Sequence, residues 1–302
     1  MTDNMDSVQT NWRAGRPVAT AALIGSAACW GFATVMSRDL LDSMAPLTLL
    51  VIQLAGSVTL LLLLAAADLP RHIKRRNIGL AAALGILEPG LAYAVGLAGL
   101  AWTTAGEASV ISASEPILIV LMSWLLFRHR PSKRFLVCIA LAVAGVLMIT
   151  GSSYAEMGRS QLLGNLLIVL ATLFAATYVV LSARIANDFP PATLALSQHI
   201  VGLGFALLLH LLMADADSVS NLPLHTIAYA ALSGVVQYAL AFWFYLFALR
   251  SFAASSAGLG LTLVPVFGLV GASLWLGEVP TTTMLFGALL ILAAVVVGQR
   301  EE

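Results

Sequence analysis

Long apolar segments recur from one end of this chain to the other. Each is about twenty residues long, which as a helix is enough to cross a hydrocarbon core of roughly 30 Å. Charged residues make up only 10% of the chain, whereas a soluble domain of 302 residues needs far more charge to cover its surface. The sequence therefore predicts an all-α integral membrane protein with ten transmembrane helices, over residues 18–38, 46–67, 77–100, 106–127, 134–151, 161–184, 192–214, 223–249, 254–276 and 281–298.

The connectors between these segments are short and contain turn-forming residues such as Pro131 and Pro280. None could hold a folded soluble domain, so any binding site must lie at membrane depth or at the membrane rims. Residues 1–17 form a polar tail with basic residues just before the first segment. Such a tail also fits a signal peptide, but the apolar run over residues 18–37 is too long for one and lacks a clean small-residue cleavage site. We expect an uncleaved first span.

The basic residues predict the orientation of the spans. With the N-terminus in the cytoplasm, 13 of the 15 Lys and Arg residues fall on the cytoplasmic side, and only Arg38 and Arg159 fall outside. Cytoplasmic loops carry an excess of Lys and Arg, so both termini are predicted to be cytoplasmic. The expected location is the plasma membrane, which is the inner membrane in bacteria. Because the net charge is zero and the basic residues are scattered at segment ends, we expect no binding to nucleic acid.

The stretch from Gly85 to Pro131 returns in a degraded form from Gly234 onward. A constant offset of 149 positions pairs Gly85 with Gly234, Leu91 with Leu240, Ala92 with Ala241, Leu97 with Leu246, Leu100 with Leu249, Ala105 with Ala254, Pro116 with Pro265, Leu125 with Leu274 and Pro131 with Pro280. An apolar chain produces some Leu and Ala matches by chance. Two prolines and a glycine in the same register indicate an internal duplication.

The duplication predicts two repeats of five helices each, over residues 18–151 and 161–298. Since five is odd, the second repeat enters the membrane upside down relative to the first. Inverted-topology repeats are typical of secondary transporters, in which the substrate site lies near the midplane where the halves meet. The copies differ at one corner, where Gly277-Glu278 replaces Arg128-His129. The opposite orientation of the two repeats accounts for this difference.

Ten short spans in two halves of five resemble the EamA family of the drug/metabolite transporter superfamily. Each half begins with a span that has an aromatic residue near its middle, Trp30-Gly31 in one and Phe174 to Tyr178 in the other. The segment from Leu261 through Pro265 to Gly277-Glu278 also matches the family pattern, whereas Arg128-His129 departs from the commoner Gly-Glu.

Within the EamA family, the chain looks most like the aromatic amino-acid exporters. The resemblance implies a central cavity between spans one to four and six to nine. It also implies that spans five and ten are peripheral and that access alternates between the two faces of the membrane.

Two glutamates, Glu88 and Glu115, lie well inside predicted spans, and a proline follows each of them, Pro89 and Pro116. A charged carboxylate at a helix centre costs roughly 2.5–3.5 kcal/mol on insertion scales, so an acidic residue at this depth indicates function. The alternative is a protonated side chain that hydrogen-bonds to a neighbouring helix. Proline frees the carbonyl four residues earlier. We therefore expect kinks at Pro89, at Pro116 and, by the repeat register, at Pro265.

Polar and aromatic side chains supply the other candidates for substrate binding. Gln237 matches Glu88 in the repeat register and lies on one helical stripe with Ala241 and Tyr245. An aromatic wall with one amide suits a substrate that has an apolar or aromatic side chain on a polar head. The alternative is that the aromatic residues pack or face lipid. The remaining candidates are Trp30, Tyr93, Tyr178, His199, which either carries a proton or is a neutral hydrogen-bonded side chain, and Tyr238.

These features predict a secondary transporter that exports amino acids, including aromatic and apolar ones, by alternating access around a central midplane cavity. The alternative is efflux of drugs or other small metabolites, because an apolar cavity with few fixed charges permits it. An intramembrane enzyme is a remote alternative, since the sequence contains no H-E-x-x-H, G-x-S-x-G or P-loop motif. We expect no catalytic residue, no metal and no cofactor. The expected partners are the small-molecule substrate and the lipid bilayer, and the oligomeric state is open between monomer and homodimer.

Overall fold

A computed structural model describes residues 16–67, 77–127, 159–213, 222–252 and 263–299, with isolated positions between 133 and 148 and at 257 and 261. These residues form helices and turns and no strand. In chain order the helices are α1 (Arg16–Leu40), α2 (Pro46–Ala67), α3 (Ile78–Gly85), η2 (Ile86–Leu91), α4 (Ala92–Leu100), α5 (Ala105–Ser112), α6 (Glu115–Phe127), α8 (Arg159–Ser182), η3 (Ala186–Asp188), α9 (Pro191–Met213), α10 (Leu224–Gly234), η4 (Val235–Leu240), α11 (Ala241–Leu249), α13 (Val264–Gly271), η5 (Ala272–Leu276) and α14 (Thr282–Gln299).

Six of the described spans are long and apolar enough to cross a membrane, and seven if the bent pair α5–α6 forms one span. The prediction of an all-helical membrane protein is thus confirmed. The prediction of ten spans is not tested, because most of the segment 134–151 and part of the segment 254–276 lie outside the described residues.

Local sequence determines where several helices begin and end. Pro46 and Pro191 are the first residues of α2 and α9, a position where the missing N–H of proline costs no helix bond. The side chain of Thr104 caps α5 by accepting a hydrogen bond from the backbone N–H of Glu107, at 3.1 Å. Gly277 follows η5 with a φ of 68°. This left-handed conformation favours glycine and ends the helix there.

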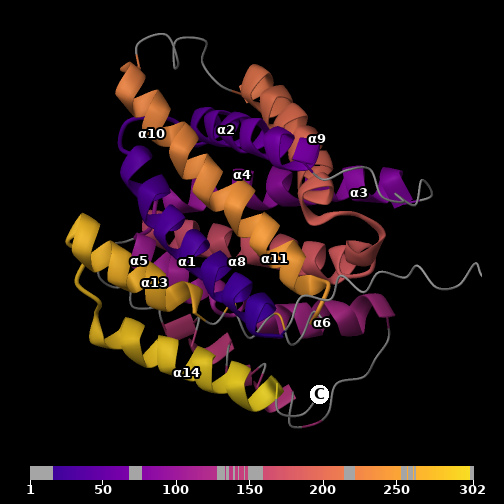
Figure 1. Cartoon of the computed structure of the whole chain (residues 1–302). Helices are drawn as coiled ribbons and strands as arrows, with labels where there is room; N and C mark the ends of the chain where they lie inside the picture. The colour runs from indigo at the N-terminus through magenta and orange to yellow at the C-terminus, as the bar shows by residue number, and fades with distance from the viewer. Residues whose placement is uncertain are drawn as a thin grey trace, which may run out of the picture.

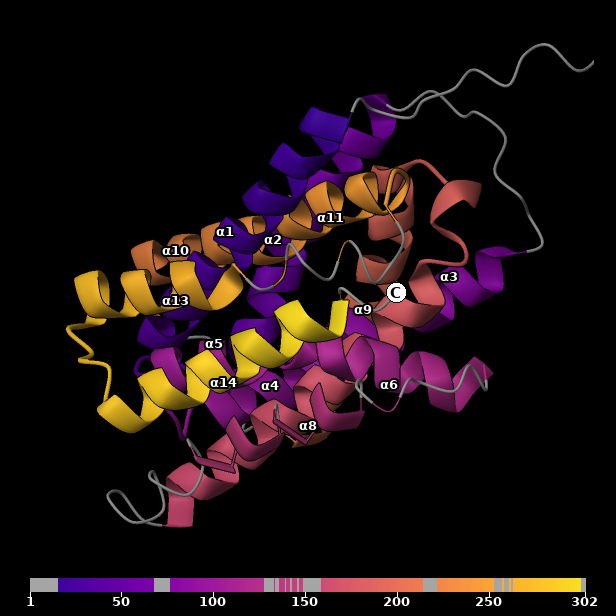
Figure 2. The same cartoon turned by 90° about the horizontal axis from the view of Figure 1, so that it is seen from below.

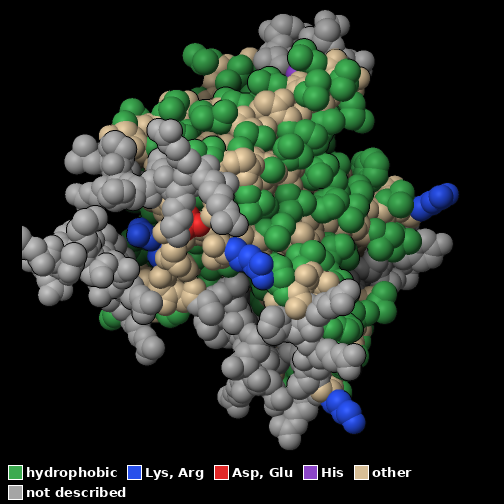
Figure 3. Space-filling model, turned by 90° about the vertical axis from the view of Figure 1, so that its right-hand side faces the viewer, with side chains coloured by type: hydrophobic (Ala, Val, Ile, Leu, Met, Phe, Trp, Pro, Cys, Tyr) green, Lys and Arg blue, Asp and Glu red, His purple; other side chains and the backbone are tan. Residues whose placement is uncertain are grey.

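The outer surface of the bundle is apolar. Leu211, Leu212 and Leu274 are 79%, 72% and 83% exposed, and many other large hydrophobic side chains are exposed with them. Hydrophobic side chains cover most of the upper and right-hand part of the face seen in Figure 3. An exposed apolar surface of this extent is expected where lipid, not water, surrounds the helices.

The helices of the two halves pack against each other in matching pairs (Figures 1 and 2). In each pair, a helix of one half contacts a helix of the other half, and the equivalent helices make the same contact. The contacts of α4, α3 and α6 with α8, α9 and α8 correspond to those of α11, α10 and α13 with α1, α2 and α1. Helices α2 and α9, which occupy equivalent places in the two halves, contact each other. Helix α14 lies at the edge of the bundle.

The same local irregularity occurs in both halves. The π-helical segments Ile86–Leu91 and Val235–Leu240 lie 149 positions apart, the offset of the sequence repeat. In the first half, Pro89 accompanies the irregularity, and Glu88 has a non-helical backbone with φ −148° and ψ 125°. The second half has Tyr238 at the position of Pro89 and keeps the π-helical turn without a proline. Such turns interrupt regular helix bonding and are frequent at functional sites.

Two glycines bring backbones of opposite halves into direct contact. A Cβ atom on Gly85 would lie 2.1 Å from the backbone oxygen of Gln198, and a Cβ atom on Gly234 would lie 2.1 Å from that of Gln53. A backbone atom cannot turn aside as a side chain can. These two positions therefore accept only glycine without moving a helix.

We expect Gly85→Ala and Gly234→Ala each to destabilise the protein by about 1–3 kcal/mol or more, the range for overpacked interiors. The matched control is Gly204→Ala in α9, where a Cβ atom would meet nothing within 4 Å. Thermal unfolding of the purified protein in detergent measures the difference. Equal melting temperatures for Gly85→Ala and Gly204→Ala would contradict the close helix approach.

Candidate functional site

A cavity of about 130 Å³ lies in the interior of the bundle, between helices of both halves. Its walls are mainly apolar and aromatic, with two carboxylates, one amide and several hydroxyl groups. Helices α1, η2, α4, α5, α6, α8, η4, α11 and α13 contribute to it. The cavity therefore depends on both halves of the chain.

Seven of the ten predicted substrate-binding residues line this cavity. They are Trp30, Glu88, Tyr93, Glu115, Tyr178, Gln237 and Tyr245. Their role in substrate binding remains a prediction.

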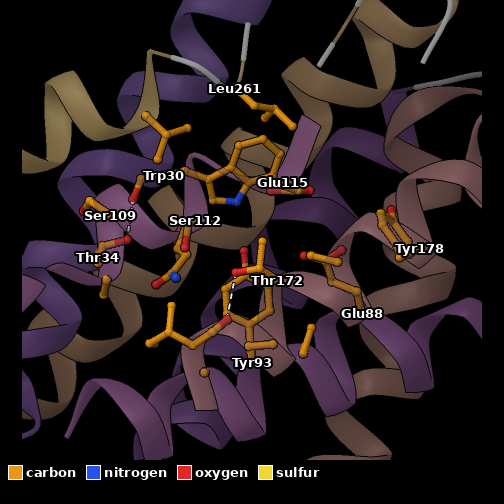
Figure 4. A pocket seen from close by; sticks show the side chains of 18 of the residues that line it. Trp30, Thr34, Glu88, Tyr93, Ser109, Ser112, Glu115, Thr172, Tyr178 and Leu261 are labelled. Atoms are coloured by element: carbon orange, nitrogen blue, oxygen red, sulfur yellow. Dashed lines mark hydrogen bonds between the residues drawn. The ribbon is translucent and has the colours of Figure 1, made fainter. Parts of the chain in front are cut away.

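The two carboxylates enter the cavity from interrupted helices. Glu88 leaves the helical path at the π-helical turn, and Glu115 begins α6 directly after the 40° bend that separates it from α5. Figure 4 shows both side chains on the same side of the cavity. Neither has a hydrogen-bond partner among the residues that the structure describes, and the described residues of the cavity lining include no Lys, Arg or His.

Aromatic rings form the wall around the carboxylates. Trp30 makes edge-to-face contacts with Phe242 and Tyr245, each with ring centroids 5.4 Å apart. Tyr93 packs edge-to-face on Tyr238 at 4.5 Å. These contacts fix the rings with the geometry that aromatic pairs favour. Both halves therefore contribute rings to the wall.

Two polar atoms of this wall lack an ordinary hydrogen bond. The hydroxyl of Tyr245 is buried without a hydrogen-bond partner among the described residues. The indole Nε1 of Trp30, close to Tyr93, makes no hydrogen bond of ordinary length and angle. Buried polar groups are almost always satisfied, so these two atoms are natural contacts for a polar group of a bound molecule.

Three predicted site residues lie behind the cavity wall. The imidazole Nδ1 of His199 lies 2.6 Å from the carbonyl oxygen of Ala195, and the ring packs edge-to-face on Phe242 at 4.9 Å. Tyr238 donates a hydrogen bond to Gln53 at 3.3 Å. The carbonyl of Ala241 accepts a hydrogen bond from Ser26 at 2.9 Å. These residues support the wall from outside the lining.

The cavity also contains hydroxyl groups that the sequence analysis did not identify. Thr34, Ser109 and Ser112 gather on the side away from the carboxylates, as Figure 4 shows. Ser109, Ser112 and Glu115 follow one another at intervals of three residues. In the continuous helix that the sequence predicts over residues 106–127, that spacing would place them on one face, and it is the sequence signal that could have identified the two serines.

The three predicted hinge prolines lie at different kinds of position. Pro89 is inside the π-helical turn of the third predicted span. Pro116 is the second residue of α6, just after the bend between α5 and α6. Pro265 lies in the first turn of α13, and several residues before it are outside the described part of the chain.

The fold and the cavity together define a class of protein, an α-helical membrane protein built around an internal chamber of the size of a small molecule. The EamA-like transporter family matches the chain twice, over residues 18–151 and 162–297. The chain belongs to this family, and it is a membrane transporter in the general sense that the family name gives.

Similar proteins agree with this assignment. An uncharacterized transporter of Archaeoglobus fulgidus is 24% identical over 275 residues, which cover 90% of this chain and 95% of that protein. A protein of Streptantibioticus cattleyicolor, named a probable terminal-alkyne amino-acid exporter, is 29% identical over 208 residues, 65% of each chain. A solved crystal structure with 18% sequence identity superposes with a TM-score of 0.66 and covers 92% of this chain and 97% of its own, which supports the fold.

Proposed function

We propose that the protein exports amino acids, including aromatic and apolar ones, by alternating access around the central cavity. The observation that carries this proposal is the combination of two carboxylates with no basic side chain among the described lining residues of a chamber walled by aromatic rings. A carboxylate pair without a counter-cation attracts an ammonium group. The aromatic wall attracts the apolar side chain of the same molecule by burying its surface.

The opposite side of the cavity suits the other end of an amino acid. Ser109 and Ser112 carry hydroxyl groups there, and the indole N–H of Trp30 points toward the cavity centre in Figure 4. Such donors bind a carboxylate by hydrogen bonds. An anion without an ammonium group would meet Glu88 and Glu115 unpaired, so we expect amines and zwitterions to be favoured over anions.

We further propose that the chain forms ten spans as two inverted repeats, over residues 18–151 and 161–298. The protein would lie in the plasma membrane, with both termini in the cytoplasm. The reciprocal packing of the halves and the two separate family matches support the duplication. The distribution of Lys and Arg supports the orientation. Impermeant labelling of tags on the two ends in intact cells tests it, and labelling of either tag would overturn it.

Counterflow in sealed liposomes tests the transport function. Liposomes that contain the purified protein and are preloaded with unlabelled phenylalanine should accumulate far more labelled phenylalanine than protein-free liposomes do. Labelled methionine or threonine should accumulate in the same way. A matched set with benzoate or phenylacetate should show no counterflow, because these anions lack the ammonium group. Transport of cationic dyes but of no amino acid would instead favour efflux of drugs or other metabolites.

A further inference from the structure

A carboxylate of the second half binds the beginning of a helix of the first half. Glu278 accepts hydrogen bonds from the backbone N–H groups of Ala105 and Gly106, at 3.0 and 2.8 Å, one on each of its oxygens. These are free donors of the first turn of α5, where the helix dipole also favours a negative charge. The contact joins residues 172 and 173 positions apart in the sequence.

The backbone around Glu278 is arranged for this contact. The left-handed φ of 68° at Gly277 turns the chain out of η5. The N–H of Glu278 then donates to the carbonyl of Ala272 at 3.2 Å. The carboxylate is consequently held over α5 by its own main chain and does not depend on a freely rotating side chain alone.

A second cavity, of about 240 Å³, lies beside this contact. Along α5 it is lined by Gly106 and Glu107, whereas the central cavity is lined by Ser109 and Ser112 of the same helix. Along α13 and η5 the order repeats, with Val264 at the central cavity and residues 269, 272 and 273 at the second one. The two cavities are therefore arranged in series along the same helices.

Protein fills the layer between the two cavities. A Cβ atom on Gly268 would lie 2.1 Å from the hydroxyl oxygen of Ser109, so α13 and α5 are in direct contact there. Beside them the carboxylate of Glu107 accepts hydrogen bonds from the side-chain amides of Gln161 at 2.8 Å and Asn165 at 3.0 Å. Opening a passage requires α5 to move relative to α13, and the Glu278 contact opposes that movement.

We propose that the contact of Glu278 with the first turn of α5 is the gate that keeps the central cavity closed at this end. The second cavity is then the vestibule through which substrate leaves. The proposal rests on the transport function proposed above. The carboxylate is not repeated in the sequence, because His129 occupies the position of Glu278 in the first repeat.

Accessibility of a cysteine in the central cavity tests the gate. Ser112→Cys, in a chain whose natural Cys29 and Cys138 are replaced by alanine, serves as the reporter. A membrane-impermeant charged methanethiosulfonate is added to either side of oriented vesicles, and Glu278→Cys identifies the side on which the gate lies. Adding Glu278→Gln should raise the labelling rate of the reporter from that side about tenfold, the effect of losing one charge-assisted interaction.

Two further variants keep the result interpretable. Ala105→Pro removes a donor of the same contact at the first position of α5, where proline fits a helix, and it should raise labelling in the same direction. Asp42→Asn removes an exposed carboxylate that pairs with Arg38 within one half, at 2.7 Å, and should leave labelling unchanged.

Unchanged labelling in both Glu278→Gln and Ala105→Pro would overturn the gate. So would an equal increase in Asp42→Asn. The reporter requires no transport, so the outcomes separate the two proposals. Raised labelling without amino-acid counterflow would leave the gate in place and remove the proposed substrate. Amino-acid counterflow with unchanged labelling would support the proposed substrate and remove the gate.

Discussion

Glu88→Gln should lower the affinity for phenylalanine by about 100-fold, while the folded protein remains as stable as before. The substitution removes one of the two carboxylates that face the ammonium group of the substrate. A hydrogen bond to a charged group contributes roughly 1.5–3 kcal/mol, and about 2.8 kcal/mol corresponds to a 100-fold change in affinity. In the free protein Glu88 has no hydrogen-bond partner among the described residues, and a neutral amide costs less to bury than a carboxylate. Competition of unlabelled phenylalanine in the counterflow assay measures the affinity, and thermal unfolding measures the stability.

Glu107→Gln is the matched control for this prediction. Glu107 is also a buried glutamate of the first half, but its carboxylate accepts hydrogen bonds from Thr103, Gln161 and Asn165. Its replacement should lower the melting temperature and leave phenylalanine affinity nearly unchanged. If Glu88→Gln instead lowers stability and spares affinity, Glu88 is a structural residue and the substrate binds elsewhere.

Gln53→Leu should cost about 2–4 kcal/mol of folding stability, because it removes three buried hydrogen bonds, each worth about 0.5–1.5 kcal/mol, and leaves the Tyr238 hydroxyl without its acceptor. The side-chain amide of Gln53 donates to Ser37 and to Ser233, each at 2.9 Å, and its oxygen accepts from Tyr238 at 3.3 Å. Ser37 in turn donates to Gln237 at 2.8 Å. This network joins α1, α2, α10 and η4, so it connects the two halves of the chain.

Thr59→Val is the matched control on the same helix. The Thr59 hydroxyl is exposed and donates only to Ala55 of its own helix, at 2.8 Å. Its loss should change the melting temperature little. A melting temperature of Gln53→Leu equal to that of Thr59→Val would mean that the network does not hold the halves together.

Gln198 occupies the place of Gln53 in the second half. It accepts a hydrogen bond from Tyr178 at 2.8 Å and lies 3.4 Å from the hydroxyl of Ser182. The pair Ser37 and Gln53 and the pair Ser182 and Gln198 are each sixteen residues apart. Aligning the two halves of the sequence did not detect this correspondence, because the alignment used the offset of 149 positions between the third and eighth spans. The first two spans of the halves correspond at a different offset.

The cavity could be predicted in part. The intramembrane glutamates and Gln237 were identified because a polar residue inside an apolar run is conspicuous. The hydroxyls of Thr34, Ser109 and Thr172 were missed, since serine and threonine occur throughout membrane helices without a ligand. His199 is equally conspicuous in the sequence, yet it lies behind Phe242. A polar residue at membrane depth needs a polar partner, but the sequence does not tell whether that partner belongs to the protein or to a ligand.

The sequence by itself determined that the chain is helical and membrane-embedded and where several helices begin, and it predicted that one stretch is duplicated. These properties depend on segment length, on proline and glycine positions and on residue type, all of which are local. Only the tertiary structure decided which side chains enter the cavity and that Glu278 reaches the first turn of α5. The physical reason is that these helices are apolar on nearly every side, so periodicity does not distinguish the face toward lipid from the face toward protein. That choice is made by close packing between helices that lie far apart in the chain.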